Sequence, residues 1–332
     1  NLGLELIHSG ELEAGLAQYD SAFQTLSRHP EQLRAPELRE TLLTQYASAL
    51  MQARRFTDII RVLQSPLAKA HPLTASLHFA LGLAFLRTDR PEAAAPEMKE
   101  CLAKRHLQTL SPVNPEIRLA GPYHCLGLCF SSAGQYSEAE AAFIAALRDE
   151  SSSRPVRMDL ARLYRTLQRP VDALKVLHEF IDTRRADTEV WRLGAEIALS
   201  HPSLLPFALD WTGEAIKHLP DQAILAGQHG EALLLSGDPN GAIPHLRRSA
   251  NYGDASHRAA LCLCEAACGI SPSPVTANDE SAVATYFIRW FQSLSNSPHS
   301  SLLLRVVEQI TPLERVLPSA ARLLRAALAE AA

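Results

Sequence analysis

Three residues within six positions, His124, Cys125 and Cys129, are of the types that bind a metal ion or form a reactive thiol pair. A structural zinc site needs four such ligands, usually from two chain segments at characteristic spacings. Another cysteine-rich segment lies far along the chain and contains Cys262, Cys264 and Cys268. Because neither segment has the spacing of a zinc site, the cysteines are predicted to be buried packing residues, with His124 facing outward. No metal and no cofactor are expected.

The remaining sequence lacks the motifs that are typical of enzymes. It contains no glycine-rich phosphate loop, no H-E-x-x-H and no G-x-S-x-G. The thirteen histidines are scattered. Neighbouring carboxylates such as Glu138 and Glu140 lie in amphipathic patterns, where a solvated helix face is expected. These residues are therefore predicted to be non-catalytic.

Composition limits the class of partner. The chain has 332 residues and a net charge of −4, so no attraction to nucleic acid is expected. No apolar run approaches the roughly 18 residues that span a bilayer, so no membrane insertion is expected. Six cysteines, several of them one helical turn apart, do not resemble a secreted disulfide framework. The sequence therefore favours a reducing, cytoplasmic setting.

The residues around the first cysteine pair follow a helical pattern in "LGLCFSSAGQYSEAEAAF". Gly127 and Phe130 share one helical face, Gly134 ends that helix, and Ala139 and Phe143 share the face of the next helix. Small residues at positions 127 and 139 allow two antiparallel helices to approach closely. The pattern therefore predicts a pair of packed helices.

This pattern repeats along the chain. The same separation of twelve positions recurs at Gly3/Gly15, Ala47/Ile59, Gly82/Ala94, Ala161/Ala173 and Gly230/Ala242. The pair Ala195/Ala208 has one extra residue. Successive second members are 44, 35, 45, 34, 35 and 34 positions apart. The two long steps predict insertions near residues 28–36 and 104–119.

The repeat resembles the tetratricopeptide repeat (TPR), which has a period of 34 and the pattern L-G-x2-Y, A-x3-F and a terminal proline. Here L-G-L-C-F ends at Phe130, Ala139 is followed by Phe143 four positions later, and Pro220 follows a helix. The resemblance implies an all-α fold, a TPR-type α-α solenoid that forms a right-handed superhelix of about seven helix pairs. The pairs are predicted around 1–25, 38–65, 74–104, 120–149, 154–183, 187–219 and 222–251.

The pattern fades after residue 254. Residues 1–254 are predicted to form the solenoid, and residues 255–332 are predicted to form atypical C-terminal helices that cap it. A Pro/Ser-rich linker is expected between them, near residues 270–279.

The order of repeats and insertions also resembles the C-terminal TPR region of bacterial family 2 glycosyltransferases. In that family a nucleotide-sugar transferase domain precedes the repeats and holds the catalytic residues, so none is carried over to this sequence. The chain opens without methionine, and Gly3 is already a packing residue. We therefore expect residue 1 not to be the natural start. Two hypotheses remain: the non-catalytic part of such a transferase, or a stand-alone TPR scaffold.

Both hypotheses predict a protein or peptide ligand in the concave groove, which the first helix of each pair lines. Helical periodicity predicts the groove positions. They hold Phe79, Leu83, Leu86, His124, Leu128, Met158, Arg162, Arg165, Arg192, Glu196 and Glu231. Leu4, Thr44 and Ser48 hold equivalent positions in the first two pairs.

The groove is predicted to be apolar first, then basic, then acidic. Phe79, Leu83 and Leu128 would anchor a ligand if they are exposed together, and the arginines would bind a carboxylate or phosphate. The alternative for the charged residues is a solvated face in which Arg192 pairs with Glu196 four positions later. The Lys and Asn residues with which some TPR proteins hold a terminal carboxylate are missing from these positions. The oligomeric state is not predicted.

Overall fold

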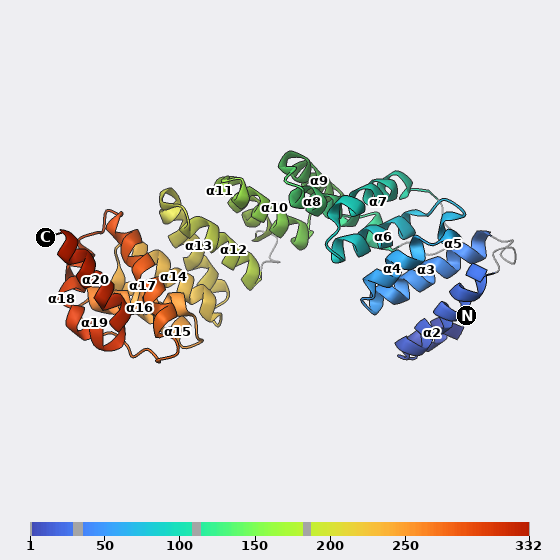
Figure 1. Ribbon diagram of the computed structural model, residues 1–332. Coiled ribbons are helices and arrows are strands. Elements are labelled where there is room, and N and C mark those ends of the chain that lie inside the picture. The colour runs from blue at the N-terminus through green and yellow to red at the C-terminus, as the bar shows by residue number, and fades with distance from the viewer. Residues whose placement is uncertain (1, 29–35, 108–113, 182–186, 332) are drawn as a thin grey trace. The chain divides into compact units, whose positions relative to one another are not determined.

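The computed structural model describes residues 2–28, 36–107, 114–181 and 187–331, and their regular structure is entirely helical (Figure 1). Those residues form twenty α-helices and two short 3-10 helices, with no strand among them. The prediction of an all-α fold is confirmed. The chain divides into two compact units, Asn1–Leu167 and Gln168–Ala332.

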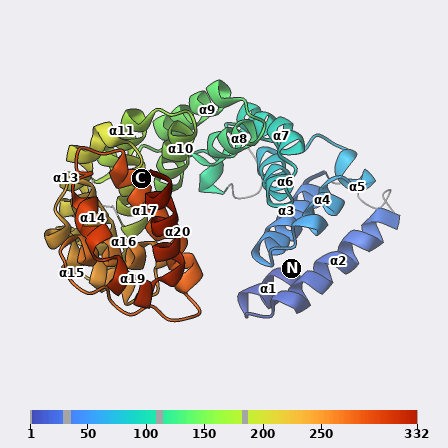
Figure 2. The same ribbon diagram turned by 60° about the vertical axis from the view of Figure 1, so that its left-hand side comes forward.

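The first unit consists of helix pairs that stack side by side (Figures 1 and 2). In chain order its helices are α1 (Leu2–His8), α2 (Leu12–Arg28), α3 (Pro36–Gln52), α4 (Phe56–Leu63), α5 (Pro66–Lys69), α6 (Ala75–Arg87), α7 (Pro91–Lys104), η2 (Pro115–Ile117), α8 (Gly121–Ser132), α9 (Tyr136–Asp149) and α10 (Arg154–Thr166). The insertion predicted near residues 104–119 contains η2, and the one predicted near residues 28–36 falls between α2 and α3. Residues 29–35 and 108–113 of these insertions lie outside the described part.

The second unit continues with helix pairs and ends in shorter helices. These are α11 (Pro170–Ile181), α12 (Thr188–Leu199), η3 (Pro202–Leu204), α13 (Leu205–His218), α14 (Ala223–Leu235), α15 (Pro239–Ala250), α16 (Ala255–Ala267), α17 (Glu280–Ser295), α18 (Leu302–Glu308), α19 (Ile310–Val316) and α20 (Pro318–Ala331).

Glycine on the first helix of a pair makes room for a large side chain on the second. A Cβ atom added at Gly127 would lie 2.5 Å from Cδ1 of Phe143, and one added at Gly230 would lie 2.6 Å from Cγ of Leu246. Real Cβ atoms essentially never come within 3.0 Å of another heavy atom. The close helix approach that the spacing predicts is therefore present in both units.

In the sixth pair, a glycine beside the predicted packing residue makes room for a large side chain. A Cβ atom added at Gly194 would meet the Trp211 ring, with Nε1 at 2.7 Å, and the neighbouring Ala195 is fully buried, as is Ala208. The Trp211 indole donates a hydrogen bond to the carbonyl of Trp191 at 2.9 Å. Helix η3 lies between the two helices, where the spacing predicts one extra residue, and the buried Trp211 lies beside Thr212, which breaks the pattern.

The turn inside most pairs contains a residue in the left-handed conformation. Gly134 and Gly237 supply it with φ angles of 73° and 85°, which cost glycine little. Arg54, Asp89 and Gln168 take the same conformation with φ of 57°, although they carry a side chain. The turn geometry is therefore repeated even where glycine is absent.

The cysteines pack in the cores, as predicted. Cys125 and Cys129 are buried, and burial raises the pKa of these thiols to about 12 and about 11. A thiol with so high a pKa holds almost no nucleophilic thiolate at neutral pH. Within the described ranges, no three His, Cys, Asp or Glu residues are grouped so that they could hold a metal ion.

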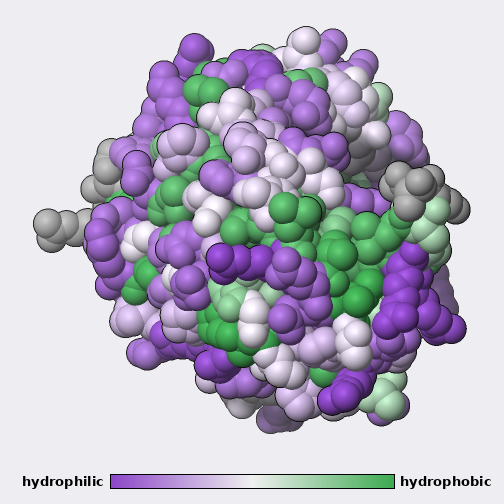
Figure 3. Space-filling model, turned by 90° about the vertical axis from the view of Figure 1, so that its left-hand side faces the viewer, coloured by the Kyte–Doolittle hydropathy of each residue, from purple (hydrophilic) through white to green (hydrophobic). Residues whose placement is uncertain are grey.

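The C-terminal helices share one core with the last repeat. Phe287 and Val306 are fully buried in the same cluster as Leu234 and Leu246 of the seventh pair. The C-terminal helices therefore belong to the same compact unit as the last repeat. The space-filling view of the side where these helices lie also shows hydrophobic residues at the surface (Figure 3).

The predicted linker near residues 270–279 is fastened to α16 by a buried carboxylate. Glu265 is 1% exposed and accepts hydrogen bonds from the Ser273 amide at 2.6 Å and from the Ser273 hydroxyl at 2.8 Å. Its other partner is the Arg247 guanidinium, at 2.9 Å. Asp279, at the end of the linker, accepts a hydrogen bond from Arg258 at 2.8 Å. The linker is therefore a part of the second unit's packing.

Two histidines in the seventh pair are held in the neutral form. The rings of His229 and His245 meet edge to face, with centroids 4.8 Å apart. Burial, reinforced by the charge that His245 would carry, lowers the pKa of His229 to about 4. Its Nδ1 lies 2.9 Å from the hydroxyl of Thr212. Protonation of His229 in the folded state would therefore oppose packing.

This arrangement predicts a loss of stability in mild acid. The pKa of His229 is lower in the folded state than in the unfolded chain, so the unfolded state binds more protons between these two values. The free energy of unfolding should fall by about 1 kcal/mol between pH 7 and pH 5, after allowance for solvent screening. Urea unfolding of wild type and His229→Gln at both pH values measures it. Equal pH dependence in the two proteins would contradict the prediction.

Candidate functional site

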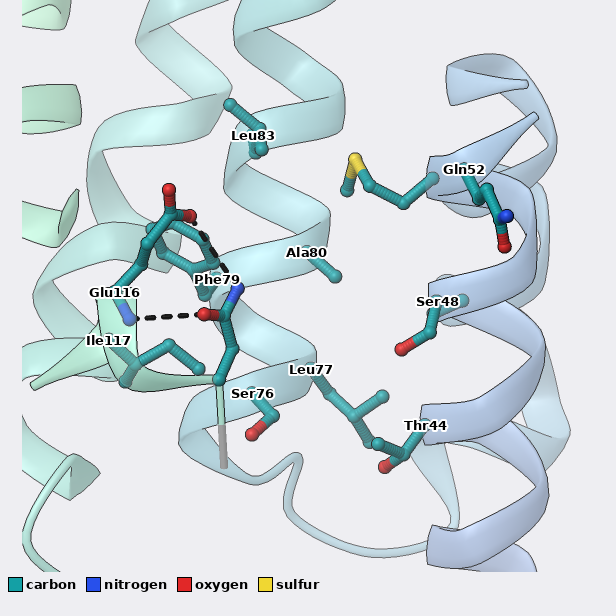
Figure 4. Close-up of a pocket in the computed structure, with 13 residues that line it drawn as sticks. Thr44, Ser48, Gln52, Ser76, Leu77, Phe79, Ala80, Leu83, Glu116 and Ile117 are labelled. Atoms are coloured by element: carbon teal, nitrogen blue, oxygen red, sulfur yellow. Dashed lines mark hydrogen bonds between the residues drawn. The ribbon is translucent and has the colours of Figure 1, made fainter. Parts of the chain in front are cut away.

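Two hollows flank helix α3 in the first unit. The α3/α6 pocket has a volume of about 520 Å³ and is closed on one side by η2 (Figure 4). The α1/α3 pocket has a volume of about 430 Å³ and lies on the other side of α3. The first helices of three successive pairs, α1, α3 and α6, therefore form a surface with two neighbouring pockets.

A row of polar side chains on α3 separates the pockets. Thr44, Ser48 and Gln52 recur at intervals of four residues and line both pockets. This polar ridge repeats at about 6 Å, because a helix rises 1.5 Å per residue. The Thr44 hydroxyl oxygen is buried and has no hydrogen-bond partner in the described part of the chain. Such a hydroxyl would gain from a ligand's polar group.

The wall opposite the ridge is apolar. Leu77 and Ala80 project from α6 toward α3 (Figure 4), and Leu83, also on α6, lines the same pocket. Phe79 forms the base of the pocket and is only 6% exposed, because Ile117 of η2 packs against it in the same buried cluster. Phe79 is thus part of the pocket's base and does not project as the anchor that we predicted. Leu83 is half-buried, so part of its side chain is accessible to a ligand.

The rim formed by η2 carries one carboxylate. Asn114 caps η2, and its side-chain carbonyl accepts a hydrogen bond from the Glu116 amide at 3.0 Å. Glu116 is exposed and is the one charged residue among the described residues that line the α3/α6 pocket. Groove periodicity missed this rim because it comes from an insertion. Its sequence signal is Asn-Pro-Glu, an N-cap followed by proline at the first helical position.

The next predicted groove residues belong to helix packing. His124 is half-buried and its Nε2 lies 2.8 Å from an Asp159 carboxylate oxygen, so it does not face outward as predicted. Met158 is 3% exposed and belongs to the core, which corrects its place in the groove. Leu86 and Leu128 are half-buried.

The charged groove residues have intramolecular neighbours. Arg162 donates a hydrogen bond to Asp159 at 2.8 Å. Burial disfavours the Asp159 carboxylate, but hydrogen bonds from His124 and Arg162 outweigh burial and lower its pKa. Arg165 is exposed.

In the second unit, Arg192 forms ion pairs with Glu189 at 2.9 Å and with Glu196. The intrahelical pair that was the alternative to a binding role is therefore present. Glu231 lies 3.4 Å from Nε2 of His257, which is buried. A role for the arginines in binding a ligand stays a prediction.

In the part of the chain that the structure describes, no helix has the length and apolar character needed to cross a membrane.

Comparison with known proteins identifies repeats in both halves of the chain. Residues 46–105 and 131–197 match models of the tetratricopeptide repeat. No curated protein matches the chain. The first family match includes α6 and the end of α3, with Ser48 and Gln52 of the polar ridge.

Several solved structures are similar to this chain, and one of them, with a TM-score above 0.5, has the same kind of fold. The C-terminal part of a TPR protein from Cytophaga hutchinsonii is 12% identical, with a TM-score of 0.56, over 83% of this chain and 96% of that one. A TPR protein from Parabacteroides merdae is 15% identical, with a TM-score of 0.49, over 79% and 95% of the two chains. The TPR protein YrrB, which has an unusual peptide-binding site, is 18% identical, with a TM-score of 0.44, over 57% and 85%. At these identities the likeness concerns the fold alone. This chain contains tetratricopeptide repeats and has an all-α TPR fold.

Proposed function

We propose that the chain is a non-catalytic TPR module that binds a peptide segment of a partner protein across α3. The observation that carries this proposal is the polar ridge of Thr44, Ser48 and Gln52 between two apolar-walled pockets. Apolar pockets anchor side chains, and hydroxyl and amide groups between them fix the ligand's backbone. The buried Thr44 hydroxyl, which lacks a partner among the described residues, is the kind of group that a bound backbone would satisfy.

The chemistry of the lining residues supports recognition over catalysis. The α3/α6 pocket is lined by hydroxyl, amide and apolar side chains with one carboxylate, Glu116. The α1/α3 pocket adds His8 and Tyr19, and the Tyr19 hydroxyl donates a hydrogen bond to Gln45 at 3.1 Å. Among these described residues no nucleophile is paired with a base, as acyl transfer would require.

Peptide binding by these repeats is compatible with both hypotheses about the full-length protein. In one, a glycosyltransferase domain precedes residue 1 and the repeats bring a partner or acceptor to it; in the other, the repeats are a stand-alone scaffold. We propose a bacterial, cytoplasmic setting for both. The reading frame upstream of residue 1 distinguishes them: an α/β domain of a few hundred residues supports the first.

The binding proposal is tested by peptide selection. Random peptides displayed on phage are selected on wild type, and the affinity of the enriched peptides is then measured for Leu83→Asp. We expect at least a tenfold loss, since one buried anchor side chain contributes about 1.5–3 kcal/mol. Ser48→Arg, at an exposed position on the ridge, should give a similar loss without touching the core.

The matched control is Leu304→Asp, which changes a leucine that is 69% exposed in the second unit. Circular dichroism melting of each variant shows whether it folds. The proposal is wrong if no peptide is enriched, or if folded Leu83→Asp and Ser48→Arg proteins bind the enriched peptides as tightly as Leu304→Asp.

A further inference from the structure

The spacing of the two pockets restricts the conformation of the ligand. One lies between α1 and α3 and the other between α3 and α6. From the usual distance between packed helices we estimate that their centres are separated by roughly 8–10 Å. In a β-strand, side chains on one face recur at about 6.6 Å and then about 13 Å, and neither distance fits the pocket pair. A polyproline II helix has three residues per turn and rises about 9.3 Å per turn, so residues three apart point the same way at the required distance. An α-helical ligand with anchors seven apart would span about 10.5 Å and also fits.

Polarity distinguishes the two remaining conformations. The backbone of an α-helical ligand satisfies its own hydrogen bonds, so it would cover the ridge and leave the Thr44 hydroxyl unsatisfied by any described residue. A polyproline II segment has no internal hydrogen bonds, and its carbonyls can accept from the hydroxyls of Thr44 and Ser48 and the amide of Gln52. Proline also places no unsatisfied N–H group on the ridge.

The charge at the rim of the α3/α6 pocket indicates which ligand residue should lie beside the side chain that enters this pocket. Glu116 stands at the rim of the α3/α6 pocket, is exposed, and is the one charged side chain among the described residues lining it. Its carboxylate lies 3.5 Å from the Asn114 side-chain amide, a weak hydrogen bond that leaves it able to bind a cation. A lysine or arginine two positions from the anchor would meet this carboxylate, whereas an acidic ligand residue would be repelled.

Resting on the proposed function, we infer that the occupant is a proline-rich segment in the polyproline II conformation. Two apolar side chains three positions apart enter the α1/α3 and α3/α6 pockets, the ridge of Thr44, Ser48 and Gln52 binds the carbonyls between them, and a basic residue lies beside Glu116. This ligand differs from the acidic segment that the arginines further along the chain suggested.

Four synthetic peptides test the inference by fluorescence anisotropy. The first is Lys-Pro-Leu-Pro-Pro-Leu-Pro-Lys, with leucines three apart; the second has one more proline between its leucines, which are then four apart. The third is an alanine-rich helical peptide with leucines seven apart and lysine ends, and the fourth replaces both lysines of the first by glutamate. We expect the first to bind at least tenfold more tightly than each of the others.

Variants of the protein test whether the polar ridge and the Glu116 rim cause these differences in peptide affinity. Ser48→Ala and Thr44→Val should each weaken the first peptide about fivefold, while Ser131→Ala, on α8 outside both pockets, should leave it unchanged. Glu116→Gln should abolish the preference for lysine over glutamate ends. Equal affinity of the first and second peptides, or a preference for the helical peptide, would overturn the inference. If phage-selected peptides still bind at Leu83 in that case, the proposed function stands; if no peptide binds, both fail.

Discussion

Replacing Gly127 by alanine is expected to lower the free energy of unfolding of the first unit by about 2 kcal/mol. The new methyl group would lie 2.5 Å from Cδ1 of Phe143, well inside the 3.0 Å that real Cβ atoms essentially never cross. Phe143 is 1% exposed and its ring lies 5.9 Å from that of His124, so it has little room to retreat. The strain should exceed the gain of roughly 1 kcal/mol that alanine brings to a helix interior.

The matched control is the same substitution at a helical glycine with space around it. A Cβ atom at Gly213 would lie 3.7 Å from Cε1 of His229, which is an ordinary van der Waals contact. Gly213→Ala should therefore raise stability by about 0.5–1 kcal/mol, opposite in sign to Gly127→Ala. Urea unfolding monitored by circular dichroism measures both.

A double substitution tests the cause of the Gly127 effect. In Gly127→Ala with Phe143→Leu, the smaller leucine leaves room for the methyl group, so the combined loss should be less than the sum of the two single losses. Additive losses, or equal effects at Gly127 and Gly213, would show that the close approach of α8 and α9 is not what requires glycine.

The helix pairs were predictable because their packing depends on short-range spacing. A small residue, a turn and a second small residue twelve positions later are all visible in one stretch of chain, as at Gly127, Gly134 and Ala139. Spacing alone did not single out Gly194, where η3 lengthens the turn and the bulky Trp211 ring lies against the glycine. Local spacing therefore predicts the fold well wherever a pair has no insertion.

The pockets were predictable only in part, because an insertion forms one wall. Periodicity along the first helices places Leu4, Thr44, Ser48 and Leu83 on the surface that the two pockets share. It carries no information about η2, whose Ile117 returns from an insertion to cover Phe79. The exposure of a residue thus depends on chain segments whose path the repeat does not specify.

The C-terminal segment illustrates the same limit for a charged residue. Glu265 lies inside the apolar run "ALCLCEAAC", where a lone carboxylate is unusual and signals a buried partner. The partner cannot be read from the sequence, because it is the backbone of a Pro/Ser-rich segment that resembles an ordinary linker. Only the structure shows that the Ser273 amide and hydroxyl both bind Glu265.

Glu265→Ala is expected to destabilise the second unit by about 3 kcal/mol, a larger loss than Gly127→Ala should cause in the first unit. The substitution leaves the Ser273 amide without its acceptor, removes the partner of Arg247 and opens a void in a site that is 1% exposed. Glu265→Gln keeps the volume and one acceptor oxygen, but its amide cannot accept from all three donors, so about half of the loss should remain.

Two measurements distinguish the loss of the Glu265 hydrogen bonds from the general effect of removing a negative charge. The sequence contains three tryptophans, Trp191, Trp211 and Trp290, all in the second unit, so tryptophan fluorescence in urea reports on that unit alone. Hydrogen exchange should accelerate first at residues 268–279, because losing the Ser273 hydrogen bonds frees the linker before α17 separates from α16. The control is Asp221→Ala, which removes a 98% exposed carboxylate 3.7 Å from Arg248 and should change stability by less than about 0.5 kcal/mol. If Glu265→Ala and Asp221→Ala unfold alike and the linker amides exchange at the wild-type rate, the buried carboxylate does not hold the C-terminal helices to the last repeat.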